Sequence, residues 1–117
     1  MSFPGLIVMP VTDIEKARTT YRALLGVDPY VKSEYYVGFH AGESEIGLDP
    51  NGKVGPLPYW DVQDVDEAIG RLKATGATVI REPEEVGGGL TIAVLADLDG
   101  NPIGLRQTGV APSGTAG

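Results

Sequence analysis

Two short stretches of the chain, VTDIEKA at residues 11–17 and VQDVDEA at residues 62–68, decide its fold. Each starts with a valine, places an aspartate two residues later, and leads into apolar residues at helical spacing. The two stretches begin 51 residues apart, at Val11 and Val62. A repeat of this period within 117 residues indicates two copies of one supersecondary unit.

Both stretches carry the signals of a helix start. Thr12 and Asp64 are residue types preferred as N-caps, and each is followed three residues later by a glutamate, which completes a capping box. Gly26 and Gly76 can adopt the left-handed conformation that ends a helix. The predicted helices cover residues 13–25 and 64–75, with apolar stripes at Ile14, Ala17, Tyr21 and Leu24 or Leu25, and at Val65, Ala68, Ile69 and Leu72.

Extended segments flank each predicted helix. One short apolar strand precedes the helix and three extended segments follow it, so that each half of the chain reads β-α-β-β-β. This order predicts an α+β fold. The predicted strands are residues 6–10, the Tyr30 region, 35–40 and 45–48 in the first half, and 57–62, 78–81, 90–96 and 103–108 in the second.

Composition and charge restrict the function classes. The formal net charge is −7, and lysines and arginines do not cluster, so we expect no nucleic-acid partner. No apolar run approaches the ~18 residues of a membrane span, so we expect no membrane partner and a cytoplasmic location. The chain has no cysteine, which excludes disulfides and thiolate metal ligands.

The length predicts one domain over residues 1–109, with a first module at 5–50 and a second at 56–108. The final residues, 110–117, consist of Val, Ala, Pro, Ser, Gly and Thr, and we predict a flexible tail.

The stretch ADLDGNPIGLRQ, residues 96–107, could be an acidic metal loop or a turn. Asp97, Asp99 and Asn101 lack the ligand number and spacing of a calcium loop. Gly100 followed by Asn101, between two apolar strands, is a typical turn signal, and the aspartates would cap it. We therefore interpret the stretch as a structural turn.

The two β-α-β-β-β modules, the helix openings and the closing sequence DLDGNPIGL at 97–105 together resemble the vicinal oxygen chelate superfamily. That superfamily includes glyoxalase I, extradiol dioxygenases, fosfomycin-resistance enzymes and bleomycin-resistance proteins. The resemblance covers about residues 5–108. It implies two tandem βαβββ modules that form a curved sheet around a cleft, with the helices outside, and a homodimer with its clefts at or near the interface.

Metal-dependent members of this superfamily place one ligand on the first strand and one on the last strand of each module. Motif position assigns these sites to Leu6 and Gly47 in the first module, and to Leu57 and Gly104 in the second. A divalent cation needs imidazole, carboxylate or thiolate donors, and these four side chains offer none. We therefore predict no metal and no cofactor.

The remaining side chains of the predicted cleft would bind a small organic molecule, because an apolar concavity with a few polar groups is the usual form of such a site. Gly47 and Gly104 could make room for a flat ring, or could simply mark strand twist or bulges. Strand alternation assigns these residues to the ligand-binding wall: Leu6, Val8, Tyr36, His40, Glu45, Gly47, Leu57, Tyr59, Gly104 and Arg106.

His40 is the only histidine of the chain. If Gly42 and Glu43 form a hairpin turn, His40 lies opposite Glu45 on the neighbouring strand. The two side chains could act as an acid–base pair, or could form an ordinary surface ion pair.

Three functions remain open. The first is a metal-free drug- or metabolite-binding protein of the bleomycin-resistance type, which would confer antibiotic resistance if the ligand is a drug. The second is a metal-independent isomerase or lyase that uses His40 with Glu45. The third is a metal-dependent lyase or dioxygenase with non-standard ligands.

Overall fold

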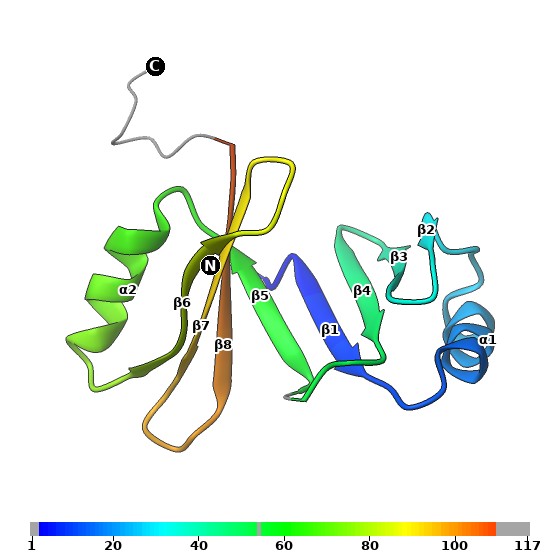
Figure 1. The fold of residues 1–117 in the computed structure, drawn as a ribbon, viewed down its shortest axis with the longest axis horizontal. Coiled ribbons are helices and arrows are strands. Elements are labelled where there is room, and N and C mark those ends of the chain that lie inside the picture. Colours follow the sequence, from blue (N-terminus) through cyan, green and yellow to red (C-terminus); the bar gives the residue numbers. More distant parts are fainter. Residues whose placement is uncertain (1–2, 54, 110–117) are drawn as a thin grey trace. The chain divides into compact units, whose positions relative to one another are not determined.

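A computed structural model describes residues 3–53 and 55–109 (Figure 1). The predicted tail at 110–117 lies outside the described residues. The chain divides into two compact units, Met1–Pro58 and Tyr59–Gly117. We call the helix and strands up to residue 49 module one, and those from residue 57 onward module two. Each contains a strand, a helix and three further strands in that order, which confirms the α+β fold of two tandem βαβββ modules. In the described part of the chain, neither helix is long and apolar enough to cross a membrane.

Module one has the sheet order β2-β3-β4-β1. β1 runs parallel to β4, and the other neighbours are antiparallel. A parallel pair requires a crossover connection, which α1 begins directly after β1. Its elements are β1 (Leu6–Pro10), α1 (Ile14–Leu25), β2 (Val31–Lys32), β3 (Val37–Ala41) and β4 (Ser44–Asp49).

Module two repeats this topology with the order β5-β8-β7-β6, and β5 runs parallel to β8. The boundary between the two units falls within β5. Its elements are β5 (Leu57–Asp61), α2 (Val65–Lys73), β6 (Thr78–Glu85), β7 (Leu90–Ala96) and β8 (Pro102–Thr108).

Equivalent residues of the two modules form equivalent strand pairs. Val8 pairs with Gly47 in module one, and Tyr59 pairs with Gly104 in module two. The amide of Val11 donates to the carbonyl of Asp49 at 3.1 Å, and the amide of Val62 donates in the same way to Arg106 at 2.9 Å. The 51-residue repeat in the sequence is therefore a repeat in structure.

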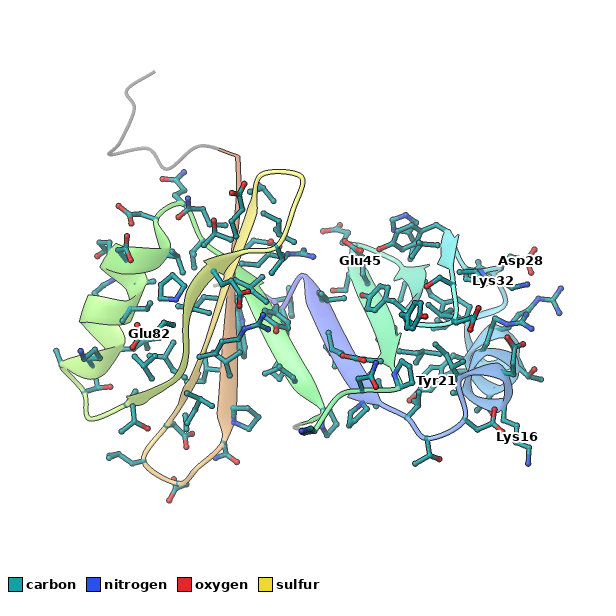
Figure 2. All side chains as sticks on the ribbon, viewed as in Figure 1. Lys16, Tyr21, Asp28, Lys32, Glu45 and Glu82 are labelled. Carbon is teal, nitrogen blue, oxygen red and sulfur yellow. The ribbon has the colours of Figure 1, made fainter. Side chains whose placement is uncertain are left out.

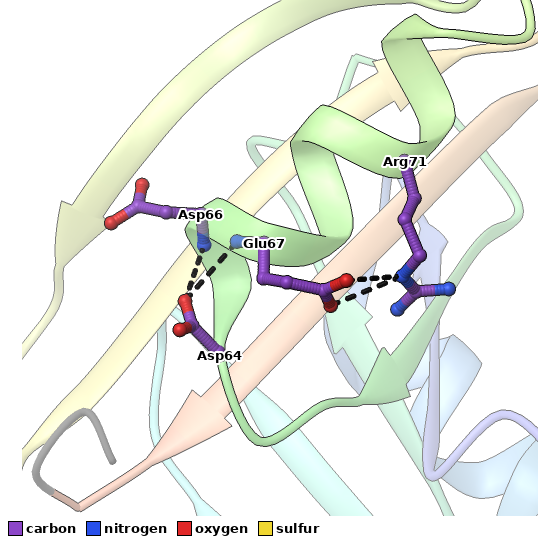
Figure 3. Close-up of polar contacts among 4 residues, drawn as sticks. All are labelled: Asp64, Asp66, Glu67 and Arg71. Atoms are coloured by element: carbon purple, nitrogen blue, oxygen red, sulfur yellow. Dashed lines mark hydrogen bonds and ion pairs between the residues drawn. The ribbon is translucent and has the colours of Figure 1, made fainter. Parts of the chain in front are cut away.

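The helix caps confirm one prediction and correct another. Asp64 caps α2, because its carboxylate accepts from the amides of Asp66 and Glu67, both at 3.1 Å (Figure 3). The predicted cap at Thr12 was wrong by one residue. Asp13, with an extended backbone at φ −127°, accepts from the Lys16 amide at 3.1 Å instead. An aspartate is a better N-cap than the threonine before it.

The predicted capping box of α2 is only half formed. The Glu67 side chain does not return to the helix start but accepts from Nε of Arg71, one turn later, at 2.8 and 3.0 Å (Figure 3). This ion pair between residues four apart supports the exposed face of the helix.

A glycine ends α1 as predicted, whereas the predicted glycine of α2 lies in the turn that follows the helix. Gly26 is the C-cap of α1, with φ 73°. α2 ends at Lys73, two residues earlier than predicted, and Gly76 has φ 103° in the turn that follows. In that turn the amide of Gly76 donates to Lys73 and the amide of Ala77 donates to Leu72, which is the Schellman pattern.

Each helix covers one face of its own sheet. In module one, Val37, Phe39 and Leu48 are fully buried, and the apolar stripe of α1 packs against them. Of the two predicted alternatives at the end of the stripe, Leu25 is partly buried and packs on this core, whereas Leu24 is 71% exposed. In module two the predicted stripe of α2 packs as a whole on a core that includes Ala93, Leu95 and Leu105.

Candidate functional site

The sheet face opposite each helix, which we call the distal face, carries the predicted site residues. In module one, register places Leu6 beside Glu45, Val8 beside Gly47, and His40 beside Glu45. Their neighbours along the strands, such as Phe39, point toward α1 instead. The hairpin turn at Gly42 and the His40–Glu45 pairing are therefore as predicted.

Tyr36 covers Gly47 on the distal face of module one. A Cβ atom built on Gly47 would lie 2.1 Å from the Tyr36 hydroxyl oxygen and 2.7 Å from its Cζ. The strand pairs around Gly47 follow one another without a register shift, so the glycine marks no bulge. The flat ring for which Gly47 makes room is thus one of the chain's own.

Gly38 is covered in the same way. A Cβ atom there would lie 2.9 Å from Cγ1 of Val31 and 3.1 Å from two ring carbons of Tyr30. Gly38 pairs directly with Gly47 across β3 and β4. The rings of Tyr30 and Tyr36 therefore pack directly on the backbone of two paired glycines, Gly38 and Gly47.

Tyr30 joins the predicted pair of His40 and Glu45 into one cluster. Its ring stacks on the imidazole of His40, with a centroid distance of 4.0 Å and an angle of 20° between the planes. Its hydroxyl donates to Oε1 of Glu45. The sequence did not predict this contact, because Tyr30 precedes β2 and no spacing rule connects it with the β3–β4 hairpin.

The distal face of module two carries an ion pair. Nε of Arg106 donates to Oδ1 of Asp61 at 2.7 Å, and Nη2 donates to Oδ2 at 3.1 Å. The Arg106 side chain is 15% exposed and that of Asp61 is 54% exposed. Two parallel bonds fix the plane of the guanidinium group. The sequence prediction placed Arg106 on this face, and the structure supplies its partner.

The other predicted residues of module two lie on the same face. Gly104 pairs with Tyr59, one row away from the ion pair, and both are buried. Leu57 is also buried and, by alternation along β5, belongs to this face. Trp60 pairs with Leu105, a core residue packed under α2, so it lies on the opposite face.

The donor chemistry of these faces does not fit a divalent metal. Leu6, Gly47, Leu57 and Gly104 have no donor atoms in their side chains, and Tyr36 lies over one of the positions. Near Gly104, the positively charged guanidinium of Arg106 would repel a metal cation. Among the described residues, no three His, Asp or Glu side chains come together as a metal site would require.

The closing turn is structural. The Asp97 carboxylate accepts from the amides of Asp99 and Asn101, both at 2.9 Å, and from the Asn101 side chain at 3.0 Å. These bonds hold the pKa of Asp97 below its usual range, and the bond from the Asn101 side chain contributes most. Gly100 takes φ 85° at the tip. The stretch from Ala96 therefore closes a hairpin, in which the Asp97 carboxylate accepts hydrogen bonds from within the turn.

Solved structures share this fold at low sequence identity. Methylmalonyl-CoA epimerase from Streptomyces coelicolor is 16% identical with a TM-score of 0.70, over 94% of this chain and 99% of that one. A hypothetical protein from Bacillus halodurans is 18% identical with a TM-score of 0.74, over 92% and 94% of the two chains. A glyoxalase/bleomycin resistance protein/dioxygenase superfamily member from Vibrio splendidus is 15% identical with a TM-score of 0.68, over 91% and 98%.

A comparison with curated protein sequences gives no significant match. The family profile of the Glyoxalase/Bleomycin resistance protein/Dioxygenase superfamily matches residues 4–105, which include both modules and the closing turn. The repeat, its shared register and this match lead to one conclusion: the chain belongs to the glyoxalase/bleomycin resistance protein/dioxygenase superfamily.

Proposed function

We propose that the chain is a metal-independent protein that binds a small organic molecule, a drug or metabolite, on its distal faces. The observation that carries the proposal is the chemistry of the four family ligand positions, which hold two leucines and two glycines. A protein with this donor set recognises its ligand through apolar contact and hydrogen bonds rather than through a shared metal ion.

The distal faces offer both kinds of contact. Leu6 and Val8, which are half-buried, supply apolar surface, and covering such surface with a ligand gains about 25 cal/mol for each Å² removed from water. Arg106 and Asp61, fixed by their two bonds, supply orientation. The net charge of −7 favours the approach of neutral or cationic molecules.

Native mass spectrometry against a compound panel, together with elemental analysis of the purified protein, tests this proposal. We expect one compound class to bind at a 1:1 ratio, and no transition metal near stoichiometry. Stoichiometric nickel, zinc, iron or manganese after mild purification would refute metal independence and favour the alternative of non-standard ligands.

Paired variants locate the binding face. We expect the double variant Leu57→Ala, Tyr59→Ala to weaken binding at least tenfold if module two holds the ligand, and Leu6→Ala, Val8→Ala to do so if module one holds it. Leu98→Ala, at a 79% exposed position in the closing turn, is the control. Unchanged affinity in both double variants would exclude the distal faces.

A second candidate function is a metal-independent isomerase or lyase. The observation that favours it is the cluster on module one, where Tyr30 stacks on His40 and donates to Glu45, so that an acid–base pair is held in one arrangement. One structural neighbour is a methylmalonyl-CoA epimerase, and at 16% identity this likeness shows the fold alone.

His40→Ala and Glu45→Gln separate the two candidates once a ligand is found. If the protein is an enzyme, we expect either change to lower kcat by about 10²-fold or more while the ligand still binds. If the protein binds its ligand without catalysis, the unmodified protein shows no turnover. The two variants would then change the ligand affinity and nothing else.

A further inference from the structure

The chain contains two asparagines, Asn51 and Asn101, and both are exposed. They differ in the residue that follows. Asn51 precedes Gly52, whose backbone nitrogen is little hindered because glycine has no Cβ. Asn101 precedes Pro102, which has no N–H. Attack of the next backbone nitrogen on the side-chain amide is therefore open to Asn51 and closed to Asn101.

The two side-chain amides are also held differently. Nδ2 of Asn101 donates to Oδ2 of Asp97 at 3.0 Å, which ties this amide into the closing turn. The Asn51 side chain makes no hydrogen bond within the part of the chain that the structure describes, where only its backbone amide donates, to Oδ1 of Asp49 at 2.8 Å. The Asn51 amide group can therefore rotate toward the nitrogen of Gly52.

Asn51 lies in the turn that follows β4 (Figure 1). The carbonyl of Asp49 accepts there from the amides of Val11 at 3.1 Å and Gly52 at 3.2 Å. Gly52 is closely packed, because a Cβ atom built on it would lie 3.3 Å from Cβ of Pro10 and 3.4 Å from the Asp49 carbonyl oxygen. This turn has little room for a longer main chain.

We propose that Asn51 is a site of spontaneous deamidation in the folded chain. The Gly52 nitrogen forms a bond to Cγ of Asn51 and gives up its proton, the bond from Cγ to Nδ2 breaks, and ammonia leaves with that proton. One water molecule then opens the resulting succinimide ring. The products are aspartate and isoaspartate, in which the main chain runs through Cβ and Cγ of residue 51.

The reaction loosens the turn in three ways. The ring consumes the N–H of Gly52, so its bond to the Asp49 carbonyl is lost in the intermediate. Isoaspartate adds one atom to the main chain beside Pro10, and either product places a new negative charge two residues from Asp49, which repels it. Figure 2 shows Glu45 near the start of β4, so the cluster that contains it lies at the other end of the strand.

Peptide mapping of the folded chain, stored in mildly alkaline buffer, tests the proposal. Trypsin cleaves after lysine and arginine, so the two asparagines fall into separate peptides, residues 33–53 and 82–106. We expect the first peptide to acquire the mass of the deamidated product at least about tenfold faster than the second, because proline blocks the attack in the second. A second chromatographic peak of the same mass identifies isoaspartate.

Asn51→Gln is the matched control, because it keeps the charge and the amide but would have to form a six-membered ring. We expect the melting temperature of the unmodified chain to fall during storage and that of the variant to stay constant. The proposal is overturned if peptide 33–53 from the stored folded chain keeps its mass, if both peptides react at the same rate, or if the variant loses stability equally.

Discussion

The distal faces of the two modules have the same register but different contents. In module one, Gly47 lies under the ring of Tyr36, and its neighbour Gly38 lies under Tyr30. In module two, the row beside Gly104 holds the ion pair of Arg106 with Asp61. Aromatic packing thus covers Gly47 in module one, whereas in module two an ion pair lies in the row next to Gly104.

The helices are also anchored differently. In module two, the buried Gln107 accepts from the first amide of α2, that of Val65, at 2.8 Å. The equivalent position in module one, three residues after Gly47, is Pro50, which has no polar side chain. α1 therefore depends on the Asp13 cap, whereas α2 has both the Asp64 cap and a bond from its own sheet.

Core truncation should give the largest effect and shows whether the modules depend on each other. Phe39→Ala in module one and Leu95→Ala in module two each remove a side chain with 0% exposure. We expect a loss in unfolding free energy of about 3–5 and about 2–5 kcal/mol, respectively, because of lost burial and the cavity left behind. Urea unfolding measures both.

Trp60 is the only tryptophan and belongs to module two, so its fluorescence reports that module. If Phe39→Ala shifts the fluorescence transition as far as the transition in circular dichroism, the modules unfold together. Separate transitions would mean that they are independent folding units.

Gly47→Ala tests the aromatic filling of module one. The added methyl overlaps the Tyr36 hydroxyl, and overpacking of this kind costs about 1–3 kcal/mol. In a Tyr36→Ala background we expect the cost to fall below about 1 kcal/mol, because the overlapping atoms are gone. Thermal or urea unfolding of the four proteins measures the coupling.

Gly70→Ala is the matched control for this prediction. Gly70 lies within α2 with open space around it, and alanine there should stabilise by roughly 0.5–1 kcal/mol. Equal costs of Gly47→Ala with and without the Tyr36 ring would mean that the ring does not lie over the glycine in solution.

Gln107→Ala tests the anchor that module one lacks. It leaves the buried amide of Val65 without its acceptor, which costs about 1–3 kcal/mol. Hydrogen exchange at the Val65 amide should quicken by more than exchange at the start of α1. If both helix starts exchange as before, the bond contributes nothing.

Asp97→Ala should give the smallest effect, and one that depends on pH. Because the folded pKa of Asp97 is held below the ordinary value of 3.8, its carboxylate stabilises the fold above that pH. The contribution is lost as pH falls through the folded pKa. We expect the melting temperatures of variant and unmodified chain to differ at pH 7 and to converge below pH 3.8.

Asp99→Ala, which makes the same change in charge within the same turn, is the matched control for Asp97→Ala. A difference for Asp97→Ala that persists unchanged to low pH would show that the turn is held by backbone geometry rather than by the carboxylate.

Local signals in the sequence determined the fold. The repeat of VTDIEKA and VQDVDEA, the helix-ending glycines and the alternation along each strand predicted both modules and the side of the sheet on which each site residue lies. Helix caps, helix ends and strand alternation involve residues within about four positions of each other, or residues that face each other across one hairpin. They can therefore be recognised from the sequence alone. Where two candidates were adjacent, the same signals misplaced the cap by one residue, at Thr12 instead of Asp13, and left Leu24 and Leu25 as alternatives.

The contents of the site depended on tertiary structure. The sequence showed that Gly47 and Gly104 offer no metal donor, but not that Tyr36 lies over Gly47, that Tyr30 joins His40 to Glu45, or that Arg106 pairs with Asp61. The partners in these contacts are separated by 10 to 45 residues in the chain. No spacing rule connects them, because the space left by an absent Cβ is filled by whichever side chain the folded sheet brings over it.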